Sequence, residues 1–290
     1  MYNRRNFLKA GSAFAGGLLI GGQSALANNP FAANASIKNF GLQLYSLRED
    51  LPKDPKGILK QVASFGYKQV ESFEGSQGMF WGMTNKEFKQ YLDGLGMIIV
   101  SSHCDINKDF ETKAAQAAEI GMKYLICPYL GAQKTIDDYK KAAEKFNNRG
   151  EICKKNGLRF AYHNHGYTFK ELEGVMPQDV LMQNTDAALV DFQMDIYWVV
   201  TPGADPIAWL NKYPGRFTLC HVKDRQKGAD ENAGDASVDL GTGSIDFSKV
   251  LKLAQQKGMK YYIVEQERYE NSTPLKSAAV DAAYMKKLKI

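Results

Sequence analysis

From residue 28 onward the chain lacks any run of 18 or more apolar residues, so this part is not expected to span a membrane. It also lacks a marked excess of charge. The chain has 37 basic and 32 acidic residues, but Arg4, Arg5 and Lys9 lie in an N-terminal segment without acids, which leaves 34 bases against 32 acids. Because a near-neutral protein attracts polyanions weakly, we expect no nucleic-acid partner.

Cysteine is scarce, with four residues in 290. Cys127 lies in YLICP and Cys220 in FTLCH, two apolar runs that are typical of buried strands. Cys104 and Cys153 show no spacing of the kind that binds metals. Since a free cysteine packs as a small apolar side chain, we expect neither a disulfide nor a cysteine metal site.

The first 27 residues have the pattern of an export signal. Basic NRRNFLK (3–9) precedes a small-residue apolar run (10–22), and ALA (25–27) follows as a cleavage site. The paired arginines resemble those of the twin-arginine signal. We therefore expect a signal peptide over residues 1–27, a polar linker over residues 28–36 and an exported, periplasmic protein. An ordinary secretory leader or an uncleaved anchor is the alternative.

From residue 37 on, short apolar or β-branched runs alternate with longer segments of helical period. These runs predict eight strands, at residues 40–46, 68–73, 97–103, 123–128, 158–164, 187–195, 217–223 and 261–267. Strands separated by helices in this way favour a parallel sheet that is covered on both faces.

The segments between the strands predict helices, because apolar residues recur three and four apart and a glycine stands at or near each end. The clearest are residues 55–66, 85–96, 110–121, 136–157 and 247–258. Repeated strand-helix units predict one α/β domain over residues 37–290, a (β/α)8 TIM barrel. The alternative, an open doubly wound sheet, would be expected to have a glycine-rich phosphate turn after its first strand, which is lacking.

Polar side chains follow most of the predicted strands. Barrels of this type have their active sites at the carboxyl ends of the strands, where these side chains would meet. All four histidines of the chain are among them. The candidates are Glu71, His103, His163, Asn164, His165, Asp195, His221, Lys223, Asp224, Glu265 and Glu267. Imidazole nitrogens mixed with carboxylate oxygens suit one divalent ion, Mn²⁺, Zn²⁺, Co²⁺ or Fe²⁺, better than Ca²⁺ or Mg²⁺.

Several of these segments carry a resemblance to a known family. They are GLQLYSLRE (41–49), GYKQVESF (66–73), AYHNHGYTF (161–169), MDIYWVVTPGADP (194–206), HVKD (221–224) and LGTGSIDFSKVL (240–251), together with Glu265. They resemble the xylose-isomerase-like barrel family of sugar phosphate isomerases and epimerases. That family also includes inosose dehydratases and a DNA-repair nuclease branch, and the near-neutral charge disfavours the nuclease.

The resemblance implies one divalent metal, held by residues that follow strands five to eight. Asp195, His221 and Glu265 match the family's ligands after strands six, seven and eight. The strand-five ligand is a carboxylate in the family, whereas this chain has His163 or His165 there, and His163 is preferred. Ketose epimerases use two metal-bound glutamates as acid and base, so simple epimerisation is less favoured. Relatives with the YHNH sequence look more like dehydratases, lyases or isomerases of oxidised sugars.

By the same resemblance, we expect a sugar isomerase or epimerase that acts through an enediolate on a small sugar, keto-sugar or polyol. The alternatives are a lyase or hydrolase, either a dehydratase or an enzyme that cleaves 3-keto-glycosides, and a sugar-binding protein without catalysis. The expected catalytic residues are Glu265, His165, Lys223 and Glu71. The expected substrate-binding residues are His103, Asn164, Trp198, Glu267 and Arg225.

Two further features have a structural and a functional interpretation. Aromatic residues near the same rim either stack on a sugar or pack in the core; besides Trp198 they are Trp81, Tyr45, Tyr162 and Tyr197. The glycine-rich LGTGSID (240–246) lacks the lysine of a phosphate loop. We interpret it as a loop in which Asp246 caps the next helix.

Overall fold

The computed structural model describes residues 36–290, so the predicted signal peptide and nearly all of the predicted linker lie outside the described residues. Ser36 pairs with Lys289 in an isolated antiparallel bridge. The described fold therefore includes one residue that we assigned to the linker. In this part of the chain, no helix is long and apolar enough to cross a membrane.

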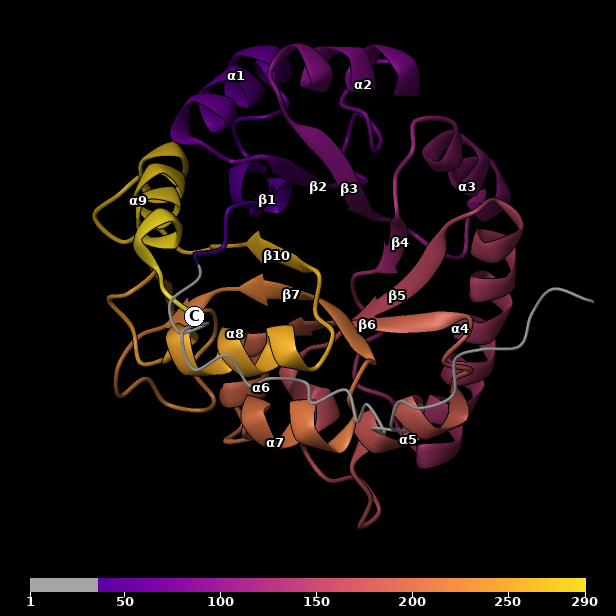
Figure 1. Cartoon of the computed structure of the whole chain (residues 1–290). Helices are drawn as coiled ribbons and strands as arrows, with labels where there is room; N and C mark the ends of the chain where they lie inside the picture. The colour runs from indigo at the N-terminus through magenta and orange to yellow at the C-terminus, as the bar shows by residue number, and fades with distance from the viewer. Residues whose placement is uncertain (1–35) are drawn as a thin grey trace, which may run out of the picture. The chain divides into compact units, whose positions relative to one another are not determined.

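Eight parallel strands close into a barrel, which Figure 1 shows along its axis. In the order around the barrel they are β1 (Gly41–Gln43), β10 (Tyr261–Val264), β7 (Phe217–Val222), β6 (Val190–Asp195), β5 (Arg159–His163), β4 (Tyr124–Cys127), β3 (Ile98–His103) and β2 (Gln69–Phe73). Each strand pairs in parallel with both of its neighbours. The predicted (β/α)8 barrel is confirmed.

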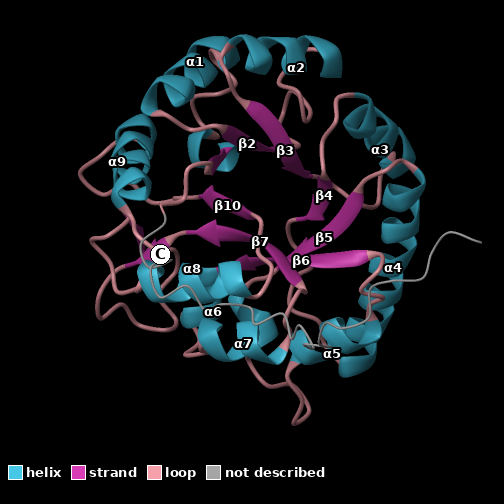
Figure 2. Cartoon of the chain, viewed as in Figure 1, coloured by secondary structure: helices cyan, strands magenta, loops and turns pink. Residues whose placement is uncertain are grey.

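Helices surround the barrel, and every strand is followed by at least one of them (Figure 2). They are α1 (Pro55–Phe65), α2 (Asn85–Gly94), α3 (Phe110–Glu119), α4 (Ile136–Lys155), α5 (Pro177–Asn184), α6 (Ile196–Val200), α7 (Pro206–Lys212), α8 (Phe247–Gln256) and α9 (Pro274–Lys287). Two short 3-10 helices, η1 (Leu44–Leu47) and η2 (Gly166–Phe169), lie in the loops after β1 and β5.

Local sequence signals fix the helix ends. At the start of α2, the Thr84 hydroxyl accepts from the Glu87 N–H while the Glu87 carboxylate accepts from the Thr84 N–H, which is a capping box. Glycines with positive φ follow the helices, for example Gly66 with 100° and Gly157 with 75°. Only glycine adopts this left-handed conformation without strain, so these residues end the helices where the sequence predicts.

Some predicted strand boundaries were wrong. The first predicted strand continues to residue 46, but the chain turns into η1 after Gln43. The last predicted strand continues to residue 267, but β10 ends at Val264. Glu265 and Glu267 therefore lie in the loop above the barrel rather than on the strand.

A small hairpin and a glycine-rich loop follow β7. β8 (Asp224–Arg225) pairs with β9 (Ser237–Val238) in an antiparallel manner. The Asp224 carboxylate accepts hydrogen bonds from the backbone N–H groups of Gly241 and Gly243, at 2.9 and 3.0 Å. Asp246 caps α8, since its carboxylate accepts from the Lys249 N–H, as predicted. The backbone N–H groups of this loop thus bind a side chain of the protein itself.

The barrel interior is apolar at its lower end. Buried Tyr124, Ile126, Ala161 and Leu219 pack together there as a small cluster. Since alternate residues of a strand point to the same side, the next inward positions are His163 on β5 and His221 on β7. The interior therefore changes from apolar to polar towards the carboxyl ends of the strands.

All four cysteines lie in the described part of the chain, where each is buried and free.

Candidate metal centre and active site

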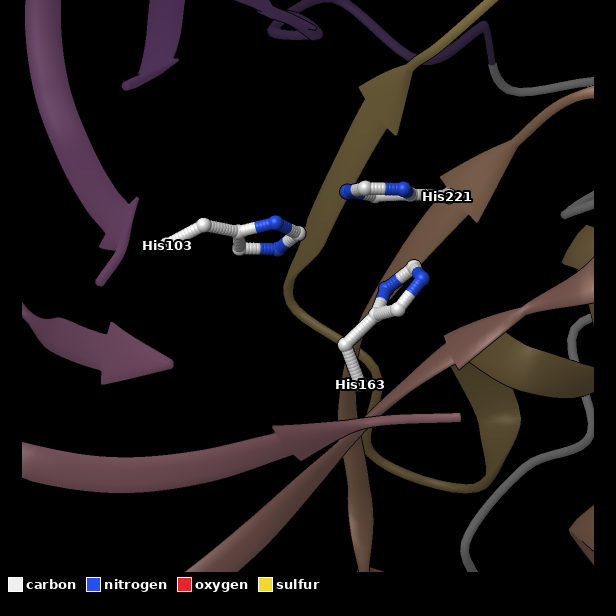
Figure 3. A group of neighbouring side chains, drawn as sticks. All are labelled: His103, His163 and His221. Atoms are coloured by element: carbon white, nitrogen blue, oxygen red, sulfur yellow. The ribbon is translucent and has the colours of Figure 1, made fainter. Parts of the chain in front are cut away.

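Three histidines from different strands converge at the carboxyl end of the barrel. Figure 3 shows the rings of His103 from β3, His163 from β5 and His221 from β7 turned toward one another. The His163 and His221 ring centroids are 4.6 Å apart, and those of His103 and His221 are 5.4 Å apart. The barrel thus brings together residues that are up to 118 positions apart in the sequence.

A buried carboxylate lies beneath these rings. Glu71 on β2 has no exposed surface. Its Oε2 accepts from Ser101 Oγ at 2.6 Å and from Gln193 Nε2 at 2.8 Å. Its Oε1 accepts from Gln43 Nε2 at 2.8 Å and lies 2.6 Å from His221 Nε2. Both oxygens are therefore saturated by protein groups.

The charge state of Glu71 follows from its neighbours. Burial alone would raise the pKa of this carboxyl, but electrostatic interactions and hydrogen bonds with His103, whose Nε2 lies 3.2 Å from Glu71 Oε1, and with His221 hold the pKa well below its usual range. Glu71 is therefore ionised and can only accept hydrogen bonds.

This ionised carboxylate determines which ring nitrogens carry protons. Gln193 must donate its Nε2 to Glu71, so its Oε1 is the acceptor for His163 Nδ1 at 3.0 Å and for His103 Nε2 at 2.8 Å. His163 Nδ1 then carries the proton, which leaves a lone pair on Nε2, 3.7 Å from Asp195 Oδ2. By the same logic, His221 donates Nε2 to Glu71. The His221 Nδ1 atom faces Glu265 Oε2 at 3.0 Å and Asp195 Oδ2 at 3.8 Å.

Asp195, His221 and Glu265 form a group that fits a divalent cation. Their potential ligand atoms all lie within 4.8 Å of one another. Asp195 Oδ1 accepts from the Trp198 N–H, but the buried Oδ2 has no hydrogen-bond partner among the described residues. Burial raises the pKa of Asp195 to about 7. A buried carboxylate oxygen needs a donor or a cation, and imidazole nitrogens and carboxylate oxygens are both ligand types that zinc binds.

His221 links Glu265 of this group to Glu71, which lies outside it. Burial alone would lower the pKa of His221, but Glu265 and Glu71 raise it to about 10. The pKa of Glu265 is correspondingly lowered to about 2, against the effect of burial, by His221 and Lys223. A cation held by Asp195, His221 and Glu265 would replace the Nδ1 proton of His221 and leave the Nε2–H on Glu71.

The three histidines form a second group of the same size, because their ligand atoms also lie within 4.8 Å of one another. However, His103 Nε2 and His163 Nδ1 point to Gln193, and His221 Nε2 points to Glu71. A cation among these nitrogens would have to break those hydrogen bonds. The geometry therefore favours the group of Asp195, His221 and Glu265, with His163 Nε2 as the fourth ligand atom at its edge.

Lys223 provides a buried positive charge beside this group. Its ammonium group bonds to the Glu267 carboxylate and lies 3.7 Å from Glu265 Oε2. It also lies over the ring faces of Tyr197 and Trp198, at 4.9 and 5.3 Å from their centroids. Burial alone would lower the pKa of Lys223, but Glu265 and Glu267 raise it well above its usual range. Lys223 is therefore charged and holds both carboxylates in place.

A cavity of about 290 Å³ opens above the candidate metal group. The cavity wall includes predicted site residues both at the base of the cavity and around its rim. Its lining consists of Tyr45, His103, Pro128, Tyr129, His163, His165, Glu265 and Glu267. A ligand in this cavity would contact Glu265 and His163 directly, while Asp195 and His221 lie below with no exposed surface.

Three predicted site residues do not line this cavity and form hydrogen bonds with other parts of the protein. Glu71 lines no part of this cavity, and its saturated carboxylate suits a positioning role rather than proton transfer. Asn164 holds the Asp195 backbone, with Nδ2 donating to the carbonyl at 3.2 Å and Oδ1 accepting from the N–H at 3.1 Å. The Arg225 guanidinium donates to the carbonyls of Ala229 and Asp230, which fixes the loop before β9.

The rim aromatics divide between the two interpretations. Tyr162 and Trp81 are buried, and Trp81 donates its indole N–H to Ser72, so these two pack in the core. Tyr45 lines the cavity. Trp198 packs beside His165 with the rings tilted by 31° and their centroids 5.4 Å apart, and it lines a neighbouring cavity.

Sequence reasoning missed Gln193, which connects Glu71 to His103 and His163. It also missed Gln43 and Ser101, and it did not single out Tyr129. A signal for Gln193 is present in β6, VDFQMD, where every second residue is polar. Because Gln193 is two positions before Asp195, it must face the same interior.

Comparison with known proteins supports the same architecture. The model of the family described as "Xylose isomerase-like TIM barrel" matches residues 59–288. The inosose dehydratase of Clostridium perfringens (strain 13 / Type A) is 28% identical over 165 residues, which is 52% of this chain and 54% of that protein. The inosose dehydratase of Lacticaseibacillus casei is 30% identical over 142 residues, 45% of this chain and 47% of that protein. The chain thus spans about half the length of the curated relatives it matches.

Solved structures extend the likeness over nearly the whole described fold. A sugar phosphate isomerase/epimerase from Parabacteroides distasonis ATCC 8503 is 30% identical with a TM-score of 0.71, and the match covers 86% of this chain and 94% of that one. A zinc-bound IolI protein is 14% identical with a TM-score of 0.70, covering 84% and 95%, and shares the fold. The chain belongs to the xylose isomerase-like TIM-barrel family.

Proposed function

We propose that this protein is a metal-dependent lyase that removes water from a cyclic polyhydroxy ketone such as an inosose, or from a related keto-sugar. The observation that carries the proposal is the asymmetry of the cavity wall. On the β5 side the wall presents the imidazoles of His163 and His165, and on the β10 side it presents the carboxylates of Glu265 and Glu267. Elimination needs two different groups, a base for a carbon-bound proton and an acid for the leaving hydroxyl.

The likeness to inosose dehydratases supports this choice over epimerisation. The zinc bound by the IolI protein supports a divalent ion in the same fold. Here Asp195, His221, Glu265 and His163 would hold the ion, and Zn²⁺, Mn²⁺, Co²⁺ or Fe²⁺ would suit these ligands. When bound, such an ion supplies positive charge for the carbonyl oxygen of the substrate.

We assign proton removal to His165. Its ring lines the cavity and packs against Tyr167 and Trp198, at centroid distances of 5.8 and 5.4 Å. Its buried Nδ1 has no hydrogen-bond partner within residues 36–290. Burial lowers the pKa of His165 to about 3, so the imidazole is neutral and has a free lone pair. Because a pKa this low makes the ring a weak base, proton removal would also require the positive charge of the bound ion to acidify the carbon next to the carbonyl. His165 is therefore a base rather than a ligand in this scheme.

The pair of Lys223 and Glu267 serves the leaving group. Glu267 lines the cavity, and the Lys223 ammonium group bonds to its carboxylate. Burial raises the pKa of Glu267, so its carboxyl group is the member of the pair that carries the proton, while Lys223 stays charged and positions it. A proton passed from Glu267 to the hydroxyl on the next carbon lets the carbon–oxygen bond break with loss of water. The electron pair of the broken C–H bond forms the new double bond, so no oxidant or reductant is needed.

A second candidate is a sugar isomerase or epimerase, which the likeness to the Parabacteroides structures supports. Both reactions begin when a base removes the same proton. In the isomerase the proton returns to another carbon or face, and no carbon–oxygen bond breaks. A sugar-binding protein without catalysis would do neither.

Incubation of the metal-loaded protein with an inosose in deuterated water tests these alternatives. We expect a product lighter by one water in the mass spectrum, and replacement of His165 by alanine should slow its formation by roughly 100-fold or more, the typical contribution of a general base. The metal content of that variant should match the wild type.

Deuterium incorporation without loss of water would favour the isomerase instead. Absence of both reactions with all four metals would contradict the proposal. Loss of metal in the His165→Ala variant would show that His165, rather than His163, is the strand-five ligand.

A further inference from the structure

A second cavity, of about 420 Å³, adjoins the first at the rim of the barrel. The two cavities share Tyr129 and His165 in their linings. Beyond these residues, the second cavity is lined by Tyr167 and Trp198, and by the exposed side chains of Lys170 and Glu231. It therefore continues the proposed active site outward rather than forming a separate site elsewhere.

The aromatic wall of the second cavity is built before any ligand binds. The His165 ring lies parallel to that of Tyr167, with an interplanar angle of 5°, and Tyr129 meets His165 edge-on at 89°. The Tyr167 hydroxyl accepts from the backbone N–H groups of Leu130 and Gly131, at 3.1 and 3.0 Å. These bonds tie the loop after β4, which carries Tyr129, to the loop after β5.

Tyr129 is the unusual member of this wall. Its side chain is 63% exposed, although it stands between two cavities. Tyr129 makes edge contacts with His165 and Tyr167, but most of its ring stays at the mouth of the site. Aromatic rings combine a broad apolar face with a polar edge. Such a face fits the C–H surface of a sugar ring, while charged groups such as Lys170 and Glu231 can bind its hydroxyls.

The sizes of the cavities also indicate an extended ligand. The first cavity, at about 290 Å³, lies just below the range for small-molecule sites, which is roughly 300 to 1,000 Å³. It has room for one small ring. The second cavity is larger and lies beside it.

We propose that the second cavity binds a second carbohydrate ring, joined to the ring that reacts in the first cavity. The preferred substrate class is then a keto-sugar that carries a glycosidic substituent, and a free inosose is a smaller substrate that fills the first cavity alone. Tyr129 and Trp198 bind the second ring, and His165 stands between the two. The assignment of the reacting ring to the first cavity depends on the proposed function, whereas the sugar-binding role of the second cavity does not.

Binding of simple disaccharides tests this proposal without turnover. We would measure Kd by calorimetry for cellobiose, lactose and trehalose, and for glucose as the single-ring reference. We expect at least one disaccharide to bind about tenfold more tightly than glucose. The Tyr129→Ala variant should lose most of that tenfold difference, because it removes the apolar face against which the second ring packs.

Ile98→Ala is the matched control, since Ile98 is 53% exposed and lies at the start of β3, at the opposite end of the barrel. It should leave every Kd unchanged. The proposal is overturned if no disaccharide binds more tightly than glucose, or if the two variants behave alike. Inosose dehydration without a disaccharide preference would overturn the second cavity's role alone. A disaccharide preference that depends on Tyr129, without dehydration, would leave that role intact and contradict the proposed reaction.

Discussion

Replacement of His221 by alanine is expected to reduce the bound metal to near zero and to abolish dehydration of an inosose. His221 presents Nδ1 to both Asp195 and Glu265 and bonds to Glu71 through Nε2. Loss of the ring removes a ligand and leaves Asp195 and Glu265 as two buried carboxylates without the cation between them. Loss of an outer partner of a metal ligand already costs roughly 10- to 100-fold in affinity, so loss of the ligand should cost more.

Plasma mass spectrometry of the purified variant checks this expectation, and Cys220→Ala is the matched control. Cys220 precedes His221 on β7 and is equally buried, but it belongs to the apolar core. The control should retain metal and activity even if its melting temperature falls. A His221→Ala protein that keeps one metal per chain would place the ion elsewhere.

The second large effect is expected from Glu71→Gln, a change that keeps the size of the side chain. Glu71 accepts hydrogen bonds through both oxygens, whereas a glutamine would direct an NH₂ group at one set of donors. Either His221 would lose the acceptor for its Nε2–H, or Gln193 would turn and release His163. Both outcomes disturb the lone pairs that face Asp195, and we expect metal affinity to fall by roughly 10- to 100-fold.

Calorimetric titration with Zn²⁺ measures this effect independently of activity. Ser101→Ala is the control, because it removes a single donor to Glu71 Oε2 and leaves the carboxylate in place. We expect its Zn²⁺ affinity to stay within a few-fold of the wild type. Circular dichroism should show that both variants are folded. Wild-type affinity in a folded Glu71→Gln protein would contradict the positioning role.

The fold could be predicted because its signals are local. Apolar runs, helical periodicity and terminal glycines such as Gly66 and Gly157 fall within a few residues of the elements that they delimit. The ends of strands were less predictable. The run FGLQLYS continues to be apolar beyond Gln43, but its backbone turns into η1, where the Gln43 side chain caps the turn. Apolar character alone does not distinguish a strand from a buried turn.

The candidate site was predictable in its members but less so in their roles. Because active sites of these barrels lie at the carboxyl ends of the strands, the polar residues at strand ends could be identified from the sequence. The structure brings His163, His221 and Glu265 together as expected. The position at a strand end does not show which of the polar residues face the cavity. Glu71, Asn164 and Arg225 are polar residues of the same rim, but each of them forms hydrogen bonds with other residues of the protein. Such pairings join residues far apart in sequence, so only the folded structure shows them.

The location of the bound metal tests the central claim most directly. We would grow crystals with Zn²⁺ and collect anomalous diffraction data on either side of the zinc absorption edge. The account predicts one strong peak among Asp195 Oδ2, His221 Nδ1, Glu265 and His163 Nε2, with the hydrogen bonds of Glu71 to His221 and Gln193 intact. A peak among His103, His163 and His221 instead, or none in this region, would contradict it.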